Sequence, residues 1–494
     1  MVIAILSVGV ILAAPLVIPY DDDSDYVPNN FYSRSAVVHP NINGKDVTMD
    51  ILSRSEGEQY FNPNFSQALL LSQCIDYKIA HPDEQVTMTM SSFHMSIVAA
   101  ACVDRNSEDF GKMKSLYDVP EDDSGYIRLS ELVIKAAKYG IETIVVGQTN
   151  SAPTLHGDVW MDDIEFAPYF ESRLDESCFG DLSDHKVSDF MTFGNCKWTS
   201  YGDKAATDMM HLKAASVSAY RDYKGVDHEG TICLTSANLD GIDGNGSNGY
   251  DSFQTGVIIS DHNELCRTVE RYTRMLSKYC GQDDVAVFRS KVLDLNKRLI
   301  DEGISGVPSG VPDDERILYY GTENDRIFRL YFTPICGPAG EWNTTYNPLC
   351  EFLSKMADSN GYIEILWNNP NFHPDFDLSI MMLETVRDSF LKNTNPRNLL
   401  YLKLRIDSPM FDEVQRINNG TVAINKVDFQ FHMKDLQVSY MENNVRHYIS
   451  IINTMNVHYG GMFYQTNSIL VIDETGINDA GTFYSEFKNQ VMHL

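Results

Sequence analysis

The sequence predicts an α/β protein built from two similar domains, and three observations support this. Strand-like and helix-like segments alternate along the chain, which favours an α/β fold with a largely buried sheet. The same order of segments occurs in each half of the 494 residues, a length sufficient for two domains. Each half also contains the same short pattern of polar residues. An internal repeat of this size is typical of two domains packed side by side.

Each half begins with a strand, a helix and a second strand ahead of its polar pattern. We expect these elements at Val86–His94, Leu129–Tyr139 and Ile141–Gly147 in the first half, and at Tyr362–Trp367, Leu378–Lys392 and Leu399–Arg405 in the second. Each half then reaches its polar pattern on a further strand, and an apolar strand follows.

The N-terminus carries the one long apolar run of the chain. Residues 2–20 hold no charge and would just span a bilayer. Pro15 and Pro19 interrupt the run, and Ala13-Ala14 offers small residues for cleavage, so a signal peptide is favoured over a retained anchor. The predicted organisation is a signal peptide at 1–20, a first domain at 21–285 with an insertion at about 151–208, a linker at 286–312, and a second domain at 313–494.

The polar pattern consists of His-x-Lys, then Ser/Thr-x-Asn, then Gln-Thr. These two are the only His-x-Lys triplets among the 13 histidines, and both carry the same sequel. The first copy is His211, Lys213, Ser236, Asn238 and Gln254; the second is His432, Lys434, Thr454, Asn456 and Gln465.

These residue types suit chemistry at a phosphodiester. A neutral imidazole can attack phosphorus, and a protonated one can give a proton to the leaving oxygen. Lysine and asparagine can stabilise negative charge on the non-bridging oxygens. Two facing copies would place a nucleophile and an acid on opposite sides of one phosphate.

At this point the chain resembles the phospholipase D superfamily, whose members carry His-x-Lys twice with a downstream Gly/Ser-Ser/Thr-x-Asn. The segment Thr235-Ser236-Ala237-Asn238-Leu239-Asp240 is similar to the family's "GSANxD". The chain departs from the family pattern where Ser218 and Ser439 replace an Asp that supports the motif. The resemblance implies two domains, each with a mixed β-sheet flanked by helices, joined as a phospholipase D-like pseudo-dimer.

The resemblance also implies a two-step phosphodiesterase mechanism through a phosphohistidine. In the family's usual order His211 is the nucleophile and His432 the acid and base, although the reverse assignment stays open. Lys213, Lys434, Asn238 and Asn456 would hold the phosphate, with Ser236 and Thr454 as hydroxyl donors. Gln254 and Gln465 stand where many members have a carboxylate that orients the histidine. A catalytically inactive binding or structural protein is the alternative, because that carboxylate and the Asp pair are missing.

Nine cysteines and four glycosylation sequons, at Asn64, Asn245, Asn343 and Asn419, agree with a secreted or lumenal protein, endosomal or lysosomal ones included. The neighbouring cysteines suggest three local bridges, although the sequence cannot fix their connectivity. These pairs are Cys178/Cys196, Cys266/Cys280 and Cys336/Cys350. Cys233 lies in an apolar run and is expected to be a buried free thiol.

The net charge of −30 and the isoelectric point near 4.7 disfavour binding to long polyanions. We therefore expect no binding to duplex DNA tracts. The substrate class stays open between a phospholipid and a single-stranded nucleic acid. No cysteine or histidine spacing resembles a zinc site, so we expect neither a metal nor another cofactor.

Overall fold

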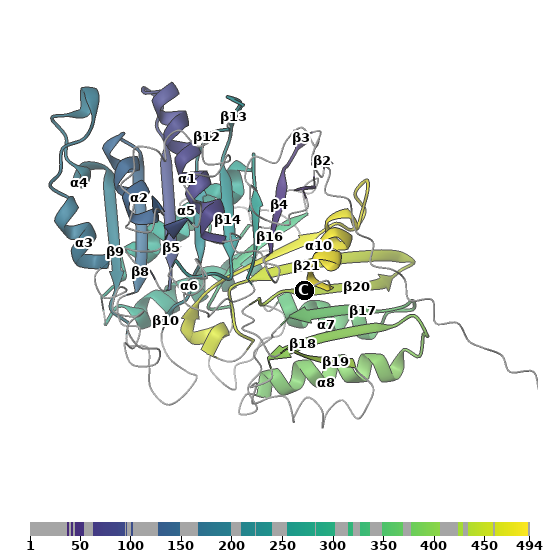
Figure 1. The fold of residues 1–494 in the computed structure, drawn as a ribbon. Coiled ribbons are helices and arrows are strands. Elements are labelled where there is room, and N and C mark those ends of the chain that lie inside the picture. The colour runs from purple at the N-terminus through teal and green to yellow at the C-terminus, as the bar shows by residue number, and fades with distance from the viewer. Residues whose placement is uncertain are drawn as a thin grey trace, which may run out of the picture.

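The computed structural model describes most of both predicted domains (Figure 1). The described residues are 37–38, 41–42, 45–53, 63–93, 95, 100–101, 127–148, 166–198, 209–222, 224–239, 254–281, 283–301, 315–319, 327–335, 348–368, 377–405, 423–427, 433–457 and 460–492. The predicted signal peptide at 1–20 and His432 lie outside them. Within the described part, no helix is both long and apolar enough to cross a membrane.

The first half forms a sheet of eight strands, drawn from purple to teal in Figure 1. Its order is β1 (Val37–Val38), β4 (Met49–Ser53), β15 (Thr255–Ile259), β14 (Thr231–Thr235), β11 (Ala214–Val217), β5 (Thr87–Ser92), β8 (Glu142–Gln148) and β9 (Met191–Cys196). The pairs β5–β8 and β8–β9 are parallel, and the other neighbours are antiparallel.

The second half forms a sheet of seven strands, drawn from green to yellow in Figure 1. Its order is β16 (Phe328–Phe332), β23 (Ser468–Asp473), β21 (Val445–Asn453), β20 (Leu436–Glu442), β17 (Glu364–Asn368), β18 (Leu399–Arg405) and β19 (Ala423–Val427). Again the last two pairs, β17–β18 and β18–β19, are parallel, and the others are antiparallel.

The two sheets correspond strand for strand. The order β4-β15-β14-β11-β5-β8-β9 matches β16-β23-β21-β20-β17-β18-β19, with the same strand directions at every step. The prediction of two similar α/β domains with mixed sheets is therefore confirmed. The six elements predicted ahead of the motifs are also found, as β5, α2 (Leu129–Lys138), β8, β17, α8 (Asp377–Lys392) and β18.

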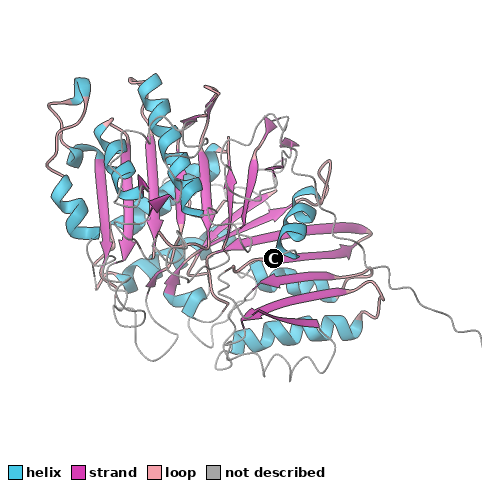
Figure 2. Cartoon of the chain, viewed as in Figure 1, coloured by secondary structure: helices cyan, strands magenta, loops and turns pink. Residues whose placement is uncertain are grey.

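Helices cover the sheets in both halves (Figure 2). In the first half α1 (Pro63–Ala80) packs on α2, and α5 (Asn263–Ser277) packs on the strands β5, β8, β11 and β14. The apolar residues of α5 recur on one face because Leu265, Val269, Tyr272 and Leu276 follow the helical period, and all four are fully buried. In the second half α7 (Pro348–Ala357) packs on α8, and α10 (Thr482–Met492) follows β23.

Short elements complete the described chain. These are β2 (Asn41–Ile42), β3 (Lys45–Asp46), β6 (Ala100–Ala101), β7 (Ile127–Arg128), α3 (Phe166–Arg173), η4 (Gly180–Leu182), α4 (Val187–Phe190), β10 (Met209–Met210), β12 (Tyr220–Arg221), β13 (Asp227–His228), η7 (Gly460–Tyr464) and β22 (Gln465–Thr466).

Two parts of the predicted organisation take a different form in the structure. Much of the linker at 286–312 is helix α6 (Val285–Asp301), whose Phe288 and Val292 are fully buried. This segment is a packed helix because it fills a core shared by the two halves, where Tyr272 stacks on Phe332 with ring centroids 3.9 Å apart. The insertion at about 151–208 includes β9, which is an integral edge strand of the first sheet.

Candidate active site at the junction of the two halves

The two motifs meet where the halves join. Strand β10, which ends one residue before His211, pairs in parallel with β22 of the second half. Met209 lies opposite Gln465 and Met210 opposite Thr466. The backbone N–H of His211 continues this pairing by donating to the carbonyl of Thr466 at 3.1 Å. The first histidine is thus held directly against the second motif.

A buried aromatic ring supports the first His-x-Lys. The ring of Phe93, which follows β5, lies 5.3 Å from the His211 ring and 5.6 Å from Nζ of Lys213. Lys213 also donates to the carbonyl of His211 at 3.1 Å. His211 is 5% exposed and Lys213 1% exposed, so both lie in a partly desolvated site where charge interactions are strengthened. In the sequence, Phe93 falls within the expected strand Val86–His94, and no motif marks it.

The hydrogen bonds of Asn467 fix the tautomer of His211. Oδ1 of Asn467 lies 2.7 Å from Nδ1 of His211. Nδ2 of Asn467 donates to the carbonyl of Gly461 at 2.9 Å, which determines the orientation of the amide. Oδ1 must therefore accept from His211, so Nδ1 carries a proton, and in the neutral ring Nε2 carries the lone pair.

Asn467, and not Gln465, is the counterpart of Gln254. The N–H of Ser236 donates to the carbonyl of Thr255, and the N–H of Thr454 donates in the same way to the carbonyl of Ser468. Gln254 immediately precedes Thr255, and Asn467 immediately precedes Ser468. The side-chain oxygen of Gln254 accepts from Oγ of Ser236 at 2.6 Å, and that of Asn467 accepts from Oγ1 of Thr454 at 3.3 Å. The sequence pattern Gln-Thr had aligned Gln254 with Gln465.

The other predicted site residues that the structure describes are buried or half-buried. Lys434, Thr454, Ser236, Asn238 and Gln254 are buried, and Asn456 is half-buried. Thr235 N–H donates to the carbonyl of Lys213, while the Asn453 side chain donates to the carbonyl of Lys434. Each Ser/Thr-x-Asn is thereby tied to its own His-x-Lys.

The serines that replace the family's Asp stabilise the sheets locally. Oγ of Ser218 accepts from the N–H of Thr87 at 2.9 Å, at the start of β5. Oγ of Ser439 donates to the carbonyl of His447 at 2.7 Å. Both serines therefore support strands next to the motif segments, since β5 pairs with β11 after Lys213, and β20 follows Lys434. Neither hydroxyl requires a carboxylate for this.

Asp435 is a buried carboxyl that the sequence analysis did not single out. It follows Lys434, is fully buried, and accepts a hydrogen bond from Oγ1 of Thr255 in the other half. Burial raises its pKa to about 7, against the lowering effects of Thr255 and Lys434. A neutral carboxylic acid can therefore persist at the domain junction at mildly acidic pH.

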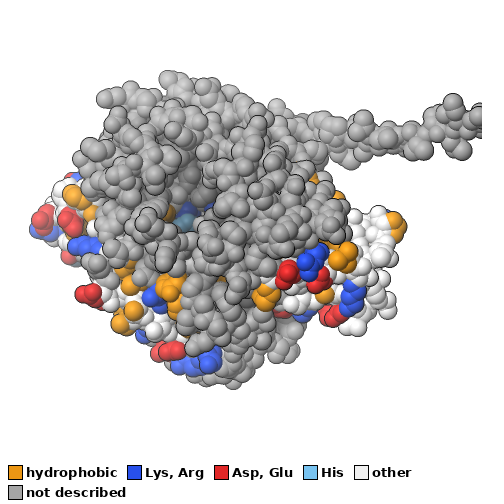
Figure 3. Space-filling model, turned by 90° about the horizontal axis from the view of Figure 1, so that it is seen from below, with side chains coloured by type: hydrophobic (Ala, Val, Ile, Leu, Met, Phe, Trp, Pro, Cys, Tyr) orange, Lys and Arg blue, Asp and Glu red, His pale blue; other side chains and the backbone are white. Residues whose placement is uncertain are grey.

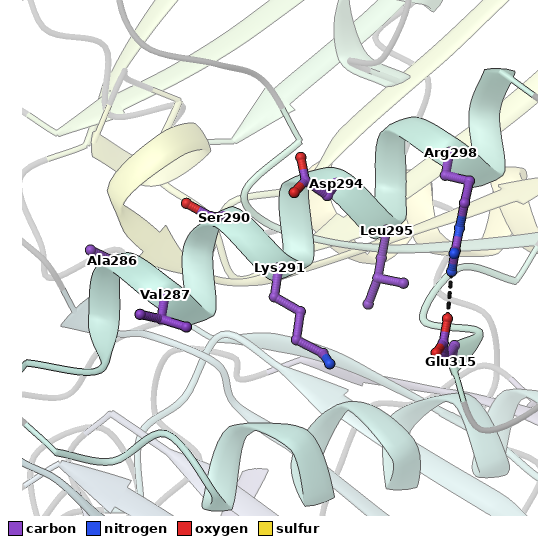
Figure 4. A pocket seen from close by; sticks show the side chains of 8 residues that line it. All are labelled: Ala286, Val287, Ser290, Lys291, Asp294, Leu295, Arg298 and Glu315. Carbon is purple, nitrogen blue, oxygen red and sulfur yellow. Dashed lines mark hydrogen bonds and ion pairs between the residues drawn. The ribbon is translucent and has the colours of Figure 1, made fainter.

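Two cavities lie elsewhere on the described surface. One runs along α6, where Lys291, Asp294 and the ion pair Arg298–Glu315 line it (Figure 4). The other is lined by residues at the N-terminal ends of β5 and β8. No motif residue lines either cavity. Seen from below, histidine surface is visible in a hollow beside Lys or Arg surface (Figure 3). Among the described residues, no group of three His, Cys, Asp or Glu side chains could hold a metal.

The cysteines are not paired as their spacing suggested. Cys178 donates to the carbonyl of Ala137, and Cys266 donates to the carbonyl of Val217 at 3.1 Å. Their predicted partners, Cys196 and Cys280, lie next to each other instead. Cys233 is fully buried and forms no disulfide, as predicted. The side chains of Cys336 and Cys350 lie outside the described residues.

Comparisons with known proteins give distant matches of fold. No family model and no curated protein matches the sequence. Polyphosphate kinase from Porphyromonas gingivalis is 8% identical, with a TM-score of 0.42 over 86% of this chain. The chain spans about half of that protein, 47%. Phosphatidylserine synthase from Haemophilus influenzae Rd KW20 is 10% identical, with a TM-score of 0.48 over 94% of this chain and 88% of that one. Yeast tyrosyl-DNA phosphodiesterase is 7% identical, with a TM-score of 0.35 over 78% of this chain and 83% of that one.

The organisation of the chain itself agrees with the resemblance that its motifs indicated. Two sheets share one strand order, and their polar motifs meet at the β10–β22 pairing. The fold is therefore the pseudo-dimer of two similar mixed-sheet domains that the sequence predicted.

Proposed function

We propose that the protein is a phosphodiesterase that acts through a phosphohistidine on His211. The observation that carries this proposal is the hydrogen bond from Nδ1 of His211 to Asn467. It leaves the lone pair on Nε2, which is the form that can attack phosphorus. Because the partner is a neutral amide, it orients the ring without favouring the imidazolium as a carboxylate would.

The cations and amides of both motifs have the chemistry to hold the phosphate during this attack. Lys213 and Lys434 supply positive charge, and Asn238 and Asn456 supply N–H donors for the non-bridging oxygens. The burial of both lysines supports the proposal, because charge stabilisation is stronger where water is excluded.

His432 is the proposed acid and base. In the first step Nε2 of His211 forms a bond to phosphorus as the bond to the leaving oxygen breaks, and His432 protonates that oxygen. In the second step the neutral His432 removes a proton from water, which attacks phosphorus and breaks the bond to His211. The proton then rests on His432, and the enzyme returns to its starting state.

The proposed substrate is a phospholipid or a single-stranded nucleic acid in a secreted or lumenal compartment. A net charge of −30 opposes the approach of long polyanions but leaves a small cationic site able to bind one phosphate. Short single-stranded ends and lipid head groups meet this condition better than duplex tracts do.

Trapping the covalent intermediate tests the proposal. The full chain with His432→Asn lacks the base for the second step, so a phosphoryl adduct should accumulate on His211. Bis(p-nitrophenyl) phosphate is the first substrate, because p-nitrophenolate leaves without a proton. Peptide mass spectrometry then locates the adduct, and single-stranded DNA and phosphatidylcholine serve as further substrates across pH 4–8.

The matched control is the double variant His211→Ala with His432→Asn, which should carry no adduct. An adduct on His432 in the His211→Ala protein would reverse the two roles. Absence of both adduct and turnover with every substrate would favour the inactive binding protein instead. Turnover is expected to persist in EDTA, and a loss that zinc or calcium restores would contradict the metal-free mechanism.

A further inference from the structure

Two thiols lie side by side at one end of the first sheet. Sγ of Cys196 and Sγ of Cys280 are 3.2 Å apart, although 84 positions separate them in sequence. Cys196 is the last residue of β9, and Cys280 follows the end of α5. A disulfide requires a sulfur–sulfur distance of about 2.05 Å, so a closure of roughly 1.1 Å would form one.

The backbone around the two thiols is already fixed in a position that suits this closure. The N–H of Lys197 donates to the carbonyl of Cys280 at 2.8 Å, and Nε1 of Trp198 donates to the carbonyl of Tyr279 at 2.9 Å. Rotation of the two cysteine side chains would therefore suffice. Gly194 leaves space for the pair, because a Cβ at that position would lie 2.9 Å from Sγ of Cys280.

We propose that Cys196 and Cys280 are an oxidation site that forms an intramolecular disulfide joining β9 to the end of α5. Formation of this bond does not depend on the proposed phosphodiesterase function. The thiols of Cys178 and Cys266 lie against the carbonyls of Ala137 and Val217. Cys280 also donates to a carbonyl, that of Leu276 at 3.3 Å, but its sulfur lies beside that of Cys196 as well. Cys74 and Cys233 are fully buried among the apolar residues of a different core cluster.

The two thiols differ in access, and this sets the order of reaction. Cys280 is partly exposed, whereas Cys196 is fully buried and burial raises its pKa well above 9.0. A small disulfide such as oxidised glutathione would meet Cys280 first. The Cys280 thiolate attacks it, forming a mixed disulfide and releasing one glutathione thiol. Cys196 then loses its proton and displaces the second glutathione, so one glutathione disulfide becomes two thiols.

The bond would brace a segment that leads to the active site. The side-chain amide of Gln148 accepts from the N–H of Met210 at 2.7 Å and donates to the carbonyl of Trp198 at 3.2 Å. Met210 immediately precedes His211, and Trp198 lies two residues after Cys196. A covalent link at Cys196 would therefore hold the segment from Cys196 to Trp198 in place, and the carbonyl of Trp198 in turn positions the amide of Gln148.

The test uses the folded full chain in a buffer of oxidised and reduced glutathione. Remaining thiols are blocked with N-ethylmaleimide, and non-reduced peptides are mapped by mass spectrometry. The wild-type protein should yield a Cys196–Cys280 peptide. Cys196→Ala should instead carry glutathione on Cys280, while Cys280→Ala should carry no glutathione on the buried Cys196. Cys266→Ala is the matched control and should retain the Cys196–Cys280 bridge.

Thermal unfolding gives a second measurement. Because the bridge closes a long loop, reduction should lower the midpoint of wild type by several degrees and leave Cys280→Ala unchanged. A wild-type map in which both thiols react with N-ethylmaleimide would overturn the proposal. So would a Cys178–Cys196 or Cys266–Cys280 peptide, or a link from Cys280 to Cys102, Cys336 or Cys350. The wild-type map decides the proposal even if a variant fails to fold.

Discussion

The two halves share a backbone plan but differ in the side chains that surround the proposed phosphate site. Their sheets have the same strand order, and in both the Ser/Thr-x-Asn segment is tied to its own His-x-Lys. At matched positions, however, the first half has Gln254 and Ala214, and the second half has Asn467 and Asp435. Repetition therefore fixes the backbone plan of the two halves, and the side chains around each motif differ.

The contrast suggests that the two histidines have unlike roles. The second half supplies Asn467, the neutral amide that orients His211. The second half also contains the buried acid Asp435, whereas Ala214 of the first half offers no ionisable group. An asymmetric pair is what a nucleophile and a general acid require, because one must be neutral when the other is protonated.

The largest expected effect comes from removing each histidine in turn. His211→Ala should abolish turnover of every diester, because it removes the covalent step. His432→Ala should slow the release of alkoxide leaving groups by about 10²–10⁴-fold, which is the usual contribution of general acid catalysis. The release of p-nitrophenolate should be slowed much less, because it needs no proton. Single-turnover rates of leaving-group release from the two substrate types measure the contrast, because the second step is common to both substrates. Equal losses for both variants on both leaving groups would contradict unlike roles.

Asp435→Asn should change stability and its pH dependence. The pKa of Asp435 is about 7 in the folded protein and has an ordinary value of 3.8. Between these two pH values the folded protein binds more protons than the unfolded chain, so its stability falls as pH rises. The loss reaches at most roughly 4 kcal/mol above pH 7, since each pKa unit is worth about 1.4 kcal/mol. The amide cannot ionise, so the variant should be more stable than wild type at pH 8 and similar near pH 4.

Urea unfolding at several pH values measures this difference. Glu474, which accepts from the N–H groups of Phe483 and Tyr484, also has a pKa raised to about 7 by burial. The Asp435→Asn protein should therefore keep part of the pH slope. A variant whose stability follows that of wild type at every pH would show that Asp435 does not titrate as described.

The strand–helix order and the meeting of the two motifs could be predicted from the sequence, because periodicity and spacing report them directly. The role of Asn467 could not. Gln465-Thr466 repeats the letters of Gln254-Thr255, but in the second half these residues form β22 and pair with β10 of the other half. The hydrogen bond that corresponds to the one between Ser236 and Thr255 is therefore made by Ser468, two residues after Thr466.

The cysteine pairing shows the same limit of sequence reasoning. Cys178 and Cys266 are the nearest cysteines along the chain to Cys196 and Cys280. The fold brings the ends of β9 and α5 together across 84 positions. Proximity along the chain has no bearing on such a long-range contact, because it depends on how a helix packs across the sheet.

Asn467→Leu should reduce kcat by about 10–100-fold. It removes a buried hydrogen bond worth about 1–3 kcal/mol, and the tautomer of His211 is then no longer fixed. Asn467→Asp should move the acidic limb of the pH–rate profile to higher pH, because a carboxylate beside the ring raises the pKa of His211. The exposed Gln85→Leu is the control for a change from amide to leucine. An unshifted profile in Asn467→Asp would contradict the contact.

The smallest expected effect compares two histidines that stack on tyrosines in the two halves. The rings of His228 and Tyr220 are 4.5 Å apart, and those of His447 and Tyr440 are 4.7 Å apart. Burial lowers the pKa of His228, but Asp261 and Asp222 outweigh this and raise its pKa above 6.5. Burial lowers the pKa of His447 below 6.5, and the nearby charges of Asp473 and Glu442 do not compensate.

The two pKa shifts have opposite consequences for stability. The contribution of His228 is fully present below pH 6.5 and is lost as pH rises through its folded pKa, whereas that of His447 is lost as pH falls below 6.5. NMR titration of the imidazole protons should give a midpoint above 6.5 for His228 and below 6.5 for His447. His228→Asn should therefore destabilise the protein more at pH 5 than at pH 8. Midpoints in the reverse order would show that Asp222 and Asp261 do not hold the charged form of His228.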